Sequence, residues 1–130
     1  MALYVQAHYT ECLTNLPSFK AKNYRLALEE SFMKIDEMML TDHGKRELGE
    51  NEKYAGCFVT VALITPNEVY CCNAGNSRTV MSKGKQAVDL SVYHKSDDSD
   101  EHRRIEAANG SVEDSRITGV PDISRALGAF

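Results

Sequence analysis

The sequence predicts an α+β fold in which helices lie on antiparallel β-structure. Three observations support this class. Apolar residues recur at helical spacing in the first 40 residues, short β-type runs joined by tight turns begin near residue 57, and a capped helical stretch begins near residue 99. The predicted order is helix, helix, four-stranded meander, helix and short strands, without internal repeats.

The N-terminal part is predicted to form two amphipathic helices, over about residues 2–15 and 23–40. The first must end before Pro17, because proline disfavours helical geometry in the residue that precedes it. In the second, Asn23 is placed to cap the first turn, and apolar residues recur at intervals of three and four. We expect this apolar face to pack on a sheet rather than to form a partner groove; its residues are Tyr24, Leu28, Phe32, Ile35 and Met39.

The stretch Thr41–Tyr54 is predicted to be an exposed, mobile connector. It contains Gly44 and Gly49, alternates charges and shows no apolar periodicity. Such a connector separates the helical part from the strands.

The meander over about residues 57–90 is divided by turn signals. Proline and glycine occur in the first and third turns, and Gly75-Asn76 supplies residues that tolerate positive φ. We therefore predict four strands joined by short turns, at Cys57–Ile64, Val69–Ala74, Arg78–Met81 and Gln86–Leu90.

A third helix is predicted over about residues 99–109, with Asp98 and Glu101 as a capping pair and Gly110 as the terminating residue. The acidic cluster at its start could suggest calcium. It lacks the glycine and the later bidentate glutamate of a calcium-binding loop, so capping is the favoured interpretation. After Ser111 we expect only short extended segments, up to Phe130.

Composition limits the classes of partner. The chain has 15 basic and 19 acidic side chains, a net charge of −4 and an isoelectric point near 5.5. This balance argues against nucleic acid and anionic membranes, which need a basic surface. The longest apolar run is short, and Met1–Leu13 lacks the pattern of a signal peptide, so the expected location is cytoplasmic or nuclear.

The cysteines are expected to be reduced thiols. Cys12, Cys57, Cys71 and Cys72 form no Cys-x-x-Cys pair. A zinc site that adds His8 or His102 lacks any ligand-type spacing, so buried small apolar side chains are the favoured interpretation.

Five short motifs follow one another along the chain: Gly56-Cys57 with Val61–Ile64, Val69–Arg78, His94–Asp98, Arg104–Gly110 with Val112, and Ser124–Gly128. In order and spacing they resemble the type-2C metal-dependent protein serine/threonine phosphatases. Ala2–Tyr9 and Asn23–Leu40 are similar to the first two helices of that family. The resemblance implies an antiparallel β-sandwich of two sheets flanked by helices, with residues 1–130 as an incomplete phosphatase 2C-like domain.

The resemblance also implies a chemistry. Members of the family hydrolyse phosphoserine and phosphothreonine of a phosphoprotein substrate with water activated by two or more Mg²⁺ or Mn²⁺ ions. The family's Asp-Gly-His-Gly-Gly motif would precede Met1, and its later aspartates would follow Phe130. We therefore expect no catalytic residue, no cofactor-binding residue and no bound metal in this chain alone, which would be inactive.

One metal position of the family does fall inside the chain. It is the aspartate of Gly-Asp-Ser-Arg, associated with an additional metal, and here it is Asn76. Asparagine offers a neutral carbonyl in place of a carboxylate, so the metal ligand is weakened. Asn76 also has a structural interpretation as a positive-φ turn residue. For Ser77, a role as nucleophile lacks a histidine nearby in sequence to act as base.

Further departures from the family pattern are Phe58, Ser96 and Ala129. The first two fit packing and loop variation. Asn76 and Ala129 together motivate an alternative function, a non-catalytic phosphatase-like scaffold or regulatory module that binds a protein.

A chain that contains only part of a two-sheet sandwich would leave a strand edge and an apolar sheet face uncovered. Both are templates for self-association. We therefore expect a homo-oligomer. Exchange of an element between copies would use Thr41–Tyr54 as the hinge.

Overall fold

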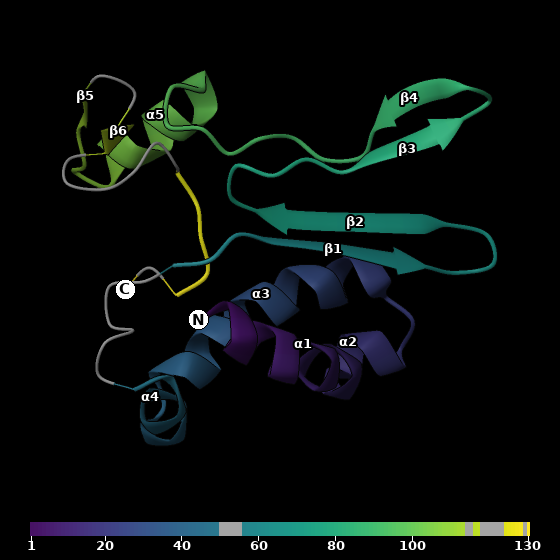
Figure 1. Cartoon of the computed structure of the whole chain (residues 1–130), viewed down its shortest axis with the longest axis horizontal. Coiled ribbons are helices and arrows are strands. Elements are labelled where there is room, and N and C mark those ends of the chain that lie inside the picture. Colours follow the sequence, from purple (N-terminus) through teal and green to yellow (C-terminus); the bar gives the residue numbers. More distant parts are fainter. Residues whose placement is uncertain (50–55, 114–115, 118–123, 129) are drawn as a thin grey trace. The chain divides into compact units, whose positions relative to one another are not determined.

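The computed structural model describes residues 1–49, 56–113, 116–117, 124–128 and 130, and it has the predicted α+β class (Figure 1). These residues form two compact units. We call the first the helical unit; it comprises Met1–Cys57, Ala62–Cys72 and Leu127–Phe130. We call the second the β-rich unit; it comprises Phe58–Val61 and Asn73–Ala126.

The two predicted N-terminal helices are present in the helical unit with nearly the expected bounds. They are α1 (Ala2–Asn15) and α3 (Tyr24–Leu40). Asn23 caps α3 as predicted, because its Oδ1 accepts from the Leu26 N–H at 3.4 Å. A short helix that we did not predict, α2 (Pro17–Lys20), lies between them and begins with proline at its first position, where no intrahelical N–H bond is lost.

The prediction that Thr41–Tyr54 is a loop is wrong over α4 (Asp42–Leu48). Thr41 caps this helix by accepting from the Gly44 N–H at 3.0 Å. Gly44 is buried, and a Cβ at this position would overlap the Met38 carbonyl oxygen at the end of α3. The glycine therefore allows close helix packing instead of marking a loop, and residues 50–54 of the predicted connector lie outside the described residues.

The core of the helical unit is the predicted apolar face of α3 packed on α1. Ile35 is fully buried, and the Tyr9 hydroxyl of α1 lies 2.7 Å from the Oγ of Ser31, which is also fully buried. The Tyr9 and Phe32 rings meet edge to face at 5.7 Å. Tyr24, the first residue of the predicted face, is half-buried and contacts the ring of Tyr70. This face thus packs mainly on another helix and only in part on a strand.

The predicted strands form separate hairpins instead of one four-stranded meander. β1 (Val59–Ile64) pairs with β2 (Val69–Ala74), and β3 (Val80–Lys83) pairs antiparallel with β4 (Gln86–Asp89). In the turn between β1 and β2, the Thr65 N–H donates to the Glu68 carbonyl at 2.9 Å. Lys85 and Gly84 have positive φ in the turn between β3 and β4, which matches the twist of a tight hairpin.

All described strands pair in twos. β5 (Val112–Glu113) and β6 (Arg116–Ile117) form the third two-stranded sheet. The described residues thus give the α+β class with small antiparallel sheets, whereas the two-sheet sandwich stays a prediction.

The third predicted helix is α5 (Ser99–Ala107), two residues shorter than expected at its C-terminal end. Asp98 caps it by accepting from the N–H groups of Asp100 and Glu101 at 3.0 and 3.4 Å. The capping interpretation is therefore confirmed for Asp98, whereas Glu101 is not the predicted capping partner: its carboxylate binds arginines, and the Asp98 N–H donates to the Lys95 carbonyl. Asn109 takes the positive φ after the helix, and the Gly110 N–H bonds back to the Ile105 carbonyl at 2.9 Å.

The cysteines are free thiols, as predicted: Cys12 is buried and the other three are half-buried. Burial raises the pKa of the Cys12, Cys57 and Cys72 thiols, so their reactive thiolate forms are disfavoured at neutral pH. Among the described helices, none has the length and apolar character needed to span a lipid bilayer.

Candidate functional site

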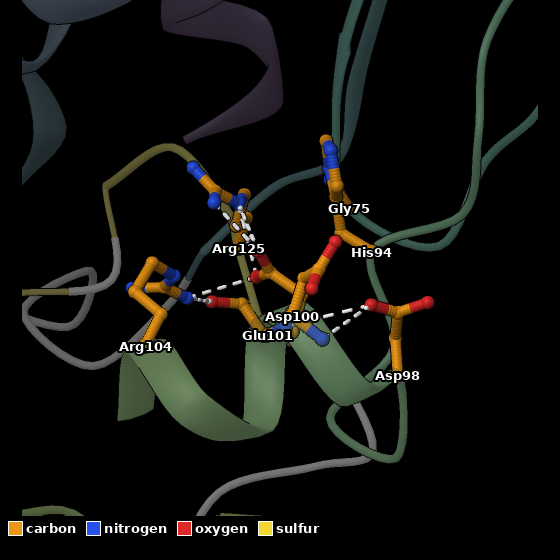
Figure 2. A network of polar contacts seen from close by, with 8 residues as sticks. Gly75, His94, Asp98, Asp100, Glu101, Arg104 and Arg125 are labelled. Carbon is orange, nitrogen blue, oxygen red and sulfur yellow. Dashed lines mark hydrogen bonds and ion pairs between the residues drawn. The ribbon is translucent and has the colours of Figure 1, made fainter. Parts of the chain in front are cut away.

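The candidate site lies in the β-rich unit, where the segment after β2 meets His94 (Figure 2). Two hydrogen bonds join them: the His94 N–H donates to the Gly75 carbonyl at 3.2 Å, and the Gly75 N–H donates to His94 Nδ1 at 3.3 Å. Gly75 has a φ of +109°, and a Cβ on it would overlap the Phe58 ring. Glycine is therefore required here, and the departure Phe58 is explained as a packing partner of this turn.

Asn76 follows directly and is half-buried. It is not among the residues with positive φ, so our interpretation of Asn76 as a positive-φ turn residue is wrong; Gly75 takes that conformation instead. The Asn76 amide makes no hydrogen bond with any described residue. Its role as a weakened metal ligand stays a prediction.

His94 is held in its neutral form. Because its Nδ1 accepts a hydrogen bond, the ring proton lies on Nε2. Burial lowers the pKa of His94, and the positive charges of Arg125 and Arg104 lower it further, against the opposite effects of Glu101 and Asp98. This imidazole therefore acts as a fixed acceptor for the Gly75 backbone near neutral pH.

Glu101 of α5 binds two arginines from different parts of the chain, and we call these three residues the arginine–glutamate cluster. Arg125 approaches the carboxylate with Nη2 at 2.5 Å and Nε at 2.9 Å, and Arg104 approaches it with Nη2 at 2.9 Å. Arg104 Nη2 also donates to the Ser124 carbonyl at 2.7 Å. Burial alone would raise the pKa of Glu101, but the hydrogen bonds from Arg125 and Arg104 lower it to about 2. The cluster therefore fixes Ser124-Arg125 on α5.

Asn73 and Arg78 order the other side of the turn. Asn73 Nδ2 donates to the carbonyls of Ser77 and Val92 at 3.1 and 3.0 Å, which joins the segment after β2 to the segment after β4. Arg78 pairs with Asp89 at 3.5 Å and lies over the Tyr93 ring at 5.4 Å. The motif arginine is thus engaged in packing.

The structure brings together parts of several motifs that are distant in sequence. Gly75, His94, Arg104 and Arg125 come from four of the five motifs and belong to one network (Figure 2), because the Ser124 N–H donates to the His94 carbonyl at 3.3 Å. In the remaining motif, Cys57 belongs to the helical unit and forms a β-bridge with Leu127. No described histidine is hydrogen-bonded to Ser77, so the structure gives it no base.

Two other motif departures have simple outcomes. Ser96 is fully buried, so the serine occupies an interior position in its loop. Ala129 lies outside the described residues.

The sequence did not predict that Glu101 binds two arginines. The spacing of three residues between Glu101 and Arg104 on one helix is a detectable ion-pair signal, although it predicts only a surface pair. The contact with Arg125 spans 24 residues and had no local signal. For Asn73, the sequence indicates a strand residue and gives no sign of its two side-chain hydrogen bonds.

The residues present do not by themselves fit a pair of divalent metal ions. Within the described ranges, no three side chains of the His, Cys, Asp or Glu type are gathered where they could hold an ion. Asn76 supplies one amide oxygen, whereas Mg²⁺ sites generally rely on carboxylates. What the arrangement can do is hold a loop rigidly and present two guanidinium groups beside it.

Comparison with known proteins gives one consistent match. The family model described as "Protein phosphatase 2C" matches residues 1–130. Two similar relatives, "Probable protein phosphatase 2C 2" and "Protein phosphatase 2C 1" of Paramecium tetraurelia, are each 42% identical over 98% of this chain and 45% of their own length. "Protein phosphatase 2C homolog 2" of Schizosaccharomyces pombe is 37% identical over 100% of this chain and 34% of its own length. The chain thus spans less than half the length of these curated relatives.

Proposed function

The chain belongs to the protein phosphatase 2C family, and on this premise we propose that the whole protein hydrolyses phosphoserine and phosphothreonine esters of phosphoprotein substrates. The observation that carries the proposal is the family match over all 130 residues. Identity of 42% over 98% of the chain supports the same chemistry.

We propose that this segment supplies scaffold for the site. The hydrogen bonds between Gly75 and His94 fix the turn that carries Asn76, and the arginine–glutamate cluster fixes the segment around Ser124. The two hairpins would be parts of the two-sheet sandwich implied by the family. Mg²⁺ or Mn²⁺ would supply the activated water in the whole protein, and the residues described here carry no step through the metal.

It follows that the isolated 130-residue chain should be inactive. The test is turnover of an aryl phosphate and of a phosphoserine peptide with millimolar Mn²⁺ or Mg²⁺. It compares the 130-residue chain with a complete protein as long as the curated relatives. We expect metal-dependent turnover from the complete protein only. Metal-dependent turnover that stays with the isolated chain through purification would contradict this expectation.

A second candidate function is a non-catalytic scaffold or regulatory module that binds a protein. The neutral Asn76 at a position where the family has aspartate favours it, and Ala129 is a second departure. Activity of the complete protein separates the two candidates. A complete protein that binds a phosphoprotein without releasing phosphate would favour the scaffold.

We propose that the protein has no nucleic-acid or membrane partner, because its net charge is −4. We also propose a cytoplasmic or nuclear location. We also propose a homo-oligomer. An exchange of elements through Thr41–Tyr54 would require α4, which occupies half of this segment and packs on α3, to detach from α3.

A further inference from the structure

The arginine–glutamate cluster carries an excess of positive charge at the surface. Two guanidinium groups share one carboxylate, which leaves one net positive charge in a chain whose total is −4. The Glu101 side chain is only 9% exposed, whereas those of Arg104 and Arg125 are each 45% exposed. The acid is thus buried beneath two cations that remain accessible to a ligand.

Both arginines keep N–H groups that no described residue accepts. A guanidinium has five N–H groups. Glu101 takes Nε and Nη2 of Arg125, and Glu101 and Ser124 take Nη2 of Arg104. No other described residue accepts from the Nη1 groups. Figure 2 shows the two side chains reaching the same carboxylate from α5 and from the segment near residue 125.

Two of the described acids near the cluster already have partners. Asp98 caps α5 with its Oδ1, and Asp100 pairs with Arg103. The neutral His94, whose Nδ1 accepts from the Gly75 N–H, adds no competing negative charge. An incoming anion would therefore meet oriented donors whose side-chain entropy has largely been lost on folding.

We propose that Arg104 and Arg125 form a binding site for a phosphate group carried on a peptide, separate from the phosphate that is hydrolysed. The inference rests on the proposed function for its substrate class. A phosphate presents three terminal oxygens, which suits two planar guanidinium groups better than the two oxygens of a carboxylate. The site would dock a phosphorylated segment of a substrate protein.

The test measures binding, not hydrolysis, so its failure is distinguishable from failure of the proposed activity. The ¹⁵N-labelled 130-residue chain is titrated with a phosphoserine peptide, its unphosphorylated twin and inorganic phosphate. The signals followed are the arginine Nε–H groups and the Ser124 and Arg125 amides. We expect saturable shifts with the phosphopeptide, weaker ones with inorganic phosphate and none with the twin.

Three variants make the assignment specific. Arg104→Gln should weaken phosphopeptide binding about tenfold, because one charged hydrogen-bonding group is lost. Arg103→Gln is the matched control on the same helix: Arg103 is exposed and contacts the exposed Asp100, so binding should weaken much less than in Arg104→Gln. Glu101→Gln should strengthen binding several-fold, because it removes the negative charge beneath the arginines. A purely structural cluster would not gain affinity in this way.

Several outcomes would overturn the proposal. Equal shifts with the phosphopeptide and its twin would exclude phosphate recognition. Equal affinity for inorganic phosphate and the phosphopeptide would make this a site for a free anion. Equal effects of Arg104→Gln and Arg103→Gln would place the ligand elsewhere. If Glu101→Gln does not fold, the comparison of Arg104→Gln with Arg103→Gln decides the question.

Discussion

Glu101 makes the stability of the β-rich unit depend on pH. Its pKa is about 2 in the folded chain, below the ordinary 4.5, because two arginines bind the carboxylate. A lowered carboxyl pKa contributes stability that is fully present above the unfolded value and is lost as the pH falls through the folded value. With screening of the half-exposed arginines, this contribution is on the order of 2 kcal/mol.

We therefore expect the urea-unfolding free energy of the wild-type chain to fall between about pH 5 and pH 2 by more than that of Glu101→Gln. The difference between the two proteins isolates this carboxyl from the other acids. His102→Gln, which removes an exposed partner of Glu106 on the same helix, is the control and should follow the wild type. If the unfolding free energies of wild type and Glu101→Gln changed in parallel with pH, the ionised Glu101 would not contribute to stability in this way.

Asn76 carries a prediction about metal dependence. In a complete protein that contains the other family ligands, Asn76→Asp would add a second hard oxygen and a full negative charge. We expect the phosphatase rate to saturate at a lower Mg²⁺ or Mn²⁺ concentration, with little change in stability because Asn76 needs no positive φ. Superimposable metal titrations of the two proteins would mean that position 76 is not a metal position. In the 130-residue chain alone the change should produce no turnover.

The residue scale also shows where sequence reasoning is limited. The turn after β2 was predicted from Gly75-Asn76, and only the structure shows that glycine takes the positive φ and that the Phe58 ring requires it. The position of the turn and its residue types could be predicted from the sequence. The need for glycine at position 75 depends on the Phe58 ring, 17 residues away. The contact between Arg125 and Glu101 is of the same kind, since no local pattern encodes it.

At the scale of elements, α4 is the instructive case. Apolar periodicity predicted α1, capping signals predicted α5, and both signals agree in α3, where Asn23 caps the first turn. In α4 a glycine lies in the first turn, which lowers helix propensity, and tertiary packing on α3 outweighs that cost. Short β-type runs between turn signals predicted the four strands of the two hairpins, although β3 begins two residues later than expected. Such runs do not say which strands pair, so the two hairpins were expected to form one sheet.

The packing of α4 is testable through Gly44. Gly44→Ala would place a methyl group against the Met38 carbonyl and the Met39 backbone, which are not flexible side-chain ends. Although alanine favours helices, we expect a net loss of about 1 to 3 kcal/mol, as for overpacked cores. Lys45→Ala, at an exposed position of the same helix, is the control and should change stability little. Chemical denaturation monitored by circular dichroism compares them; a Gly44→Ala chain as stable as wild type would contradict the packing of α4 on α3.

At the scale of the whole molecule, the five motifs allowed the family to be predicted, and the family match over residues 1–130 confirms it. The sandwich could not be confirmed in the same way, because the described strands pair only in twos. A motif reports local chemistry, whereas a sandwich depends on contacts between sheets. The same two-stranded sheets leave strand edges without a partner among the described residues, and this observation motivates the last prediction.

We expect the isolated chain to associate with itself through these edges. Apolar side chains on the hairpins are exposed, including Ile64 at 74% and Val69 at 44% next to the turn between β1 and β2. An exposed apolar strand with free N–H and C=O groups is a template for pairing with a second copy. Light scattering coupled to size exclusion should therefore show a dimer or larger species that dissociates on dilution. Ile64→Lys should weaken association about tenfold or more, because it replaces an exposed apolar side chain with a charge that opposes strand pairing. Thr60→Lys, on the same strand, is the control. Thr60 is exposed but polar, so this change should have a smaller effect. A monomer at every concentration, or equal effects of the two lysines, would show that the hairpin edge does not drive assembly.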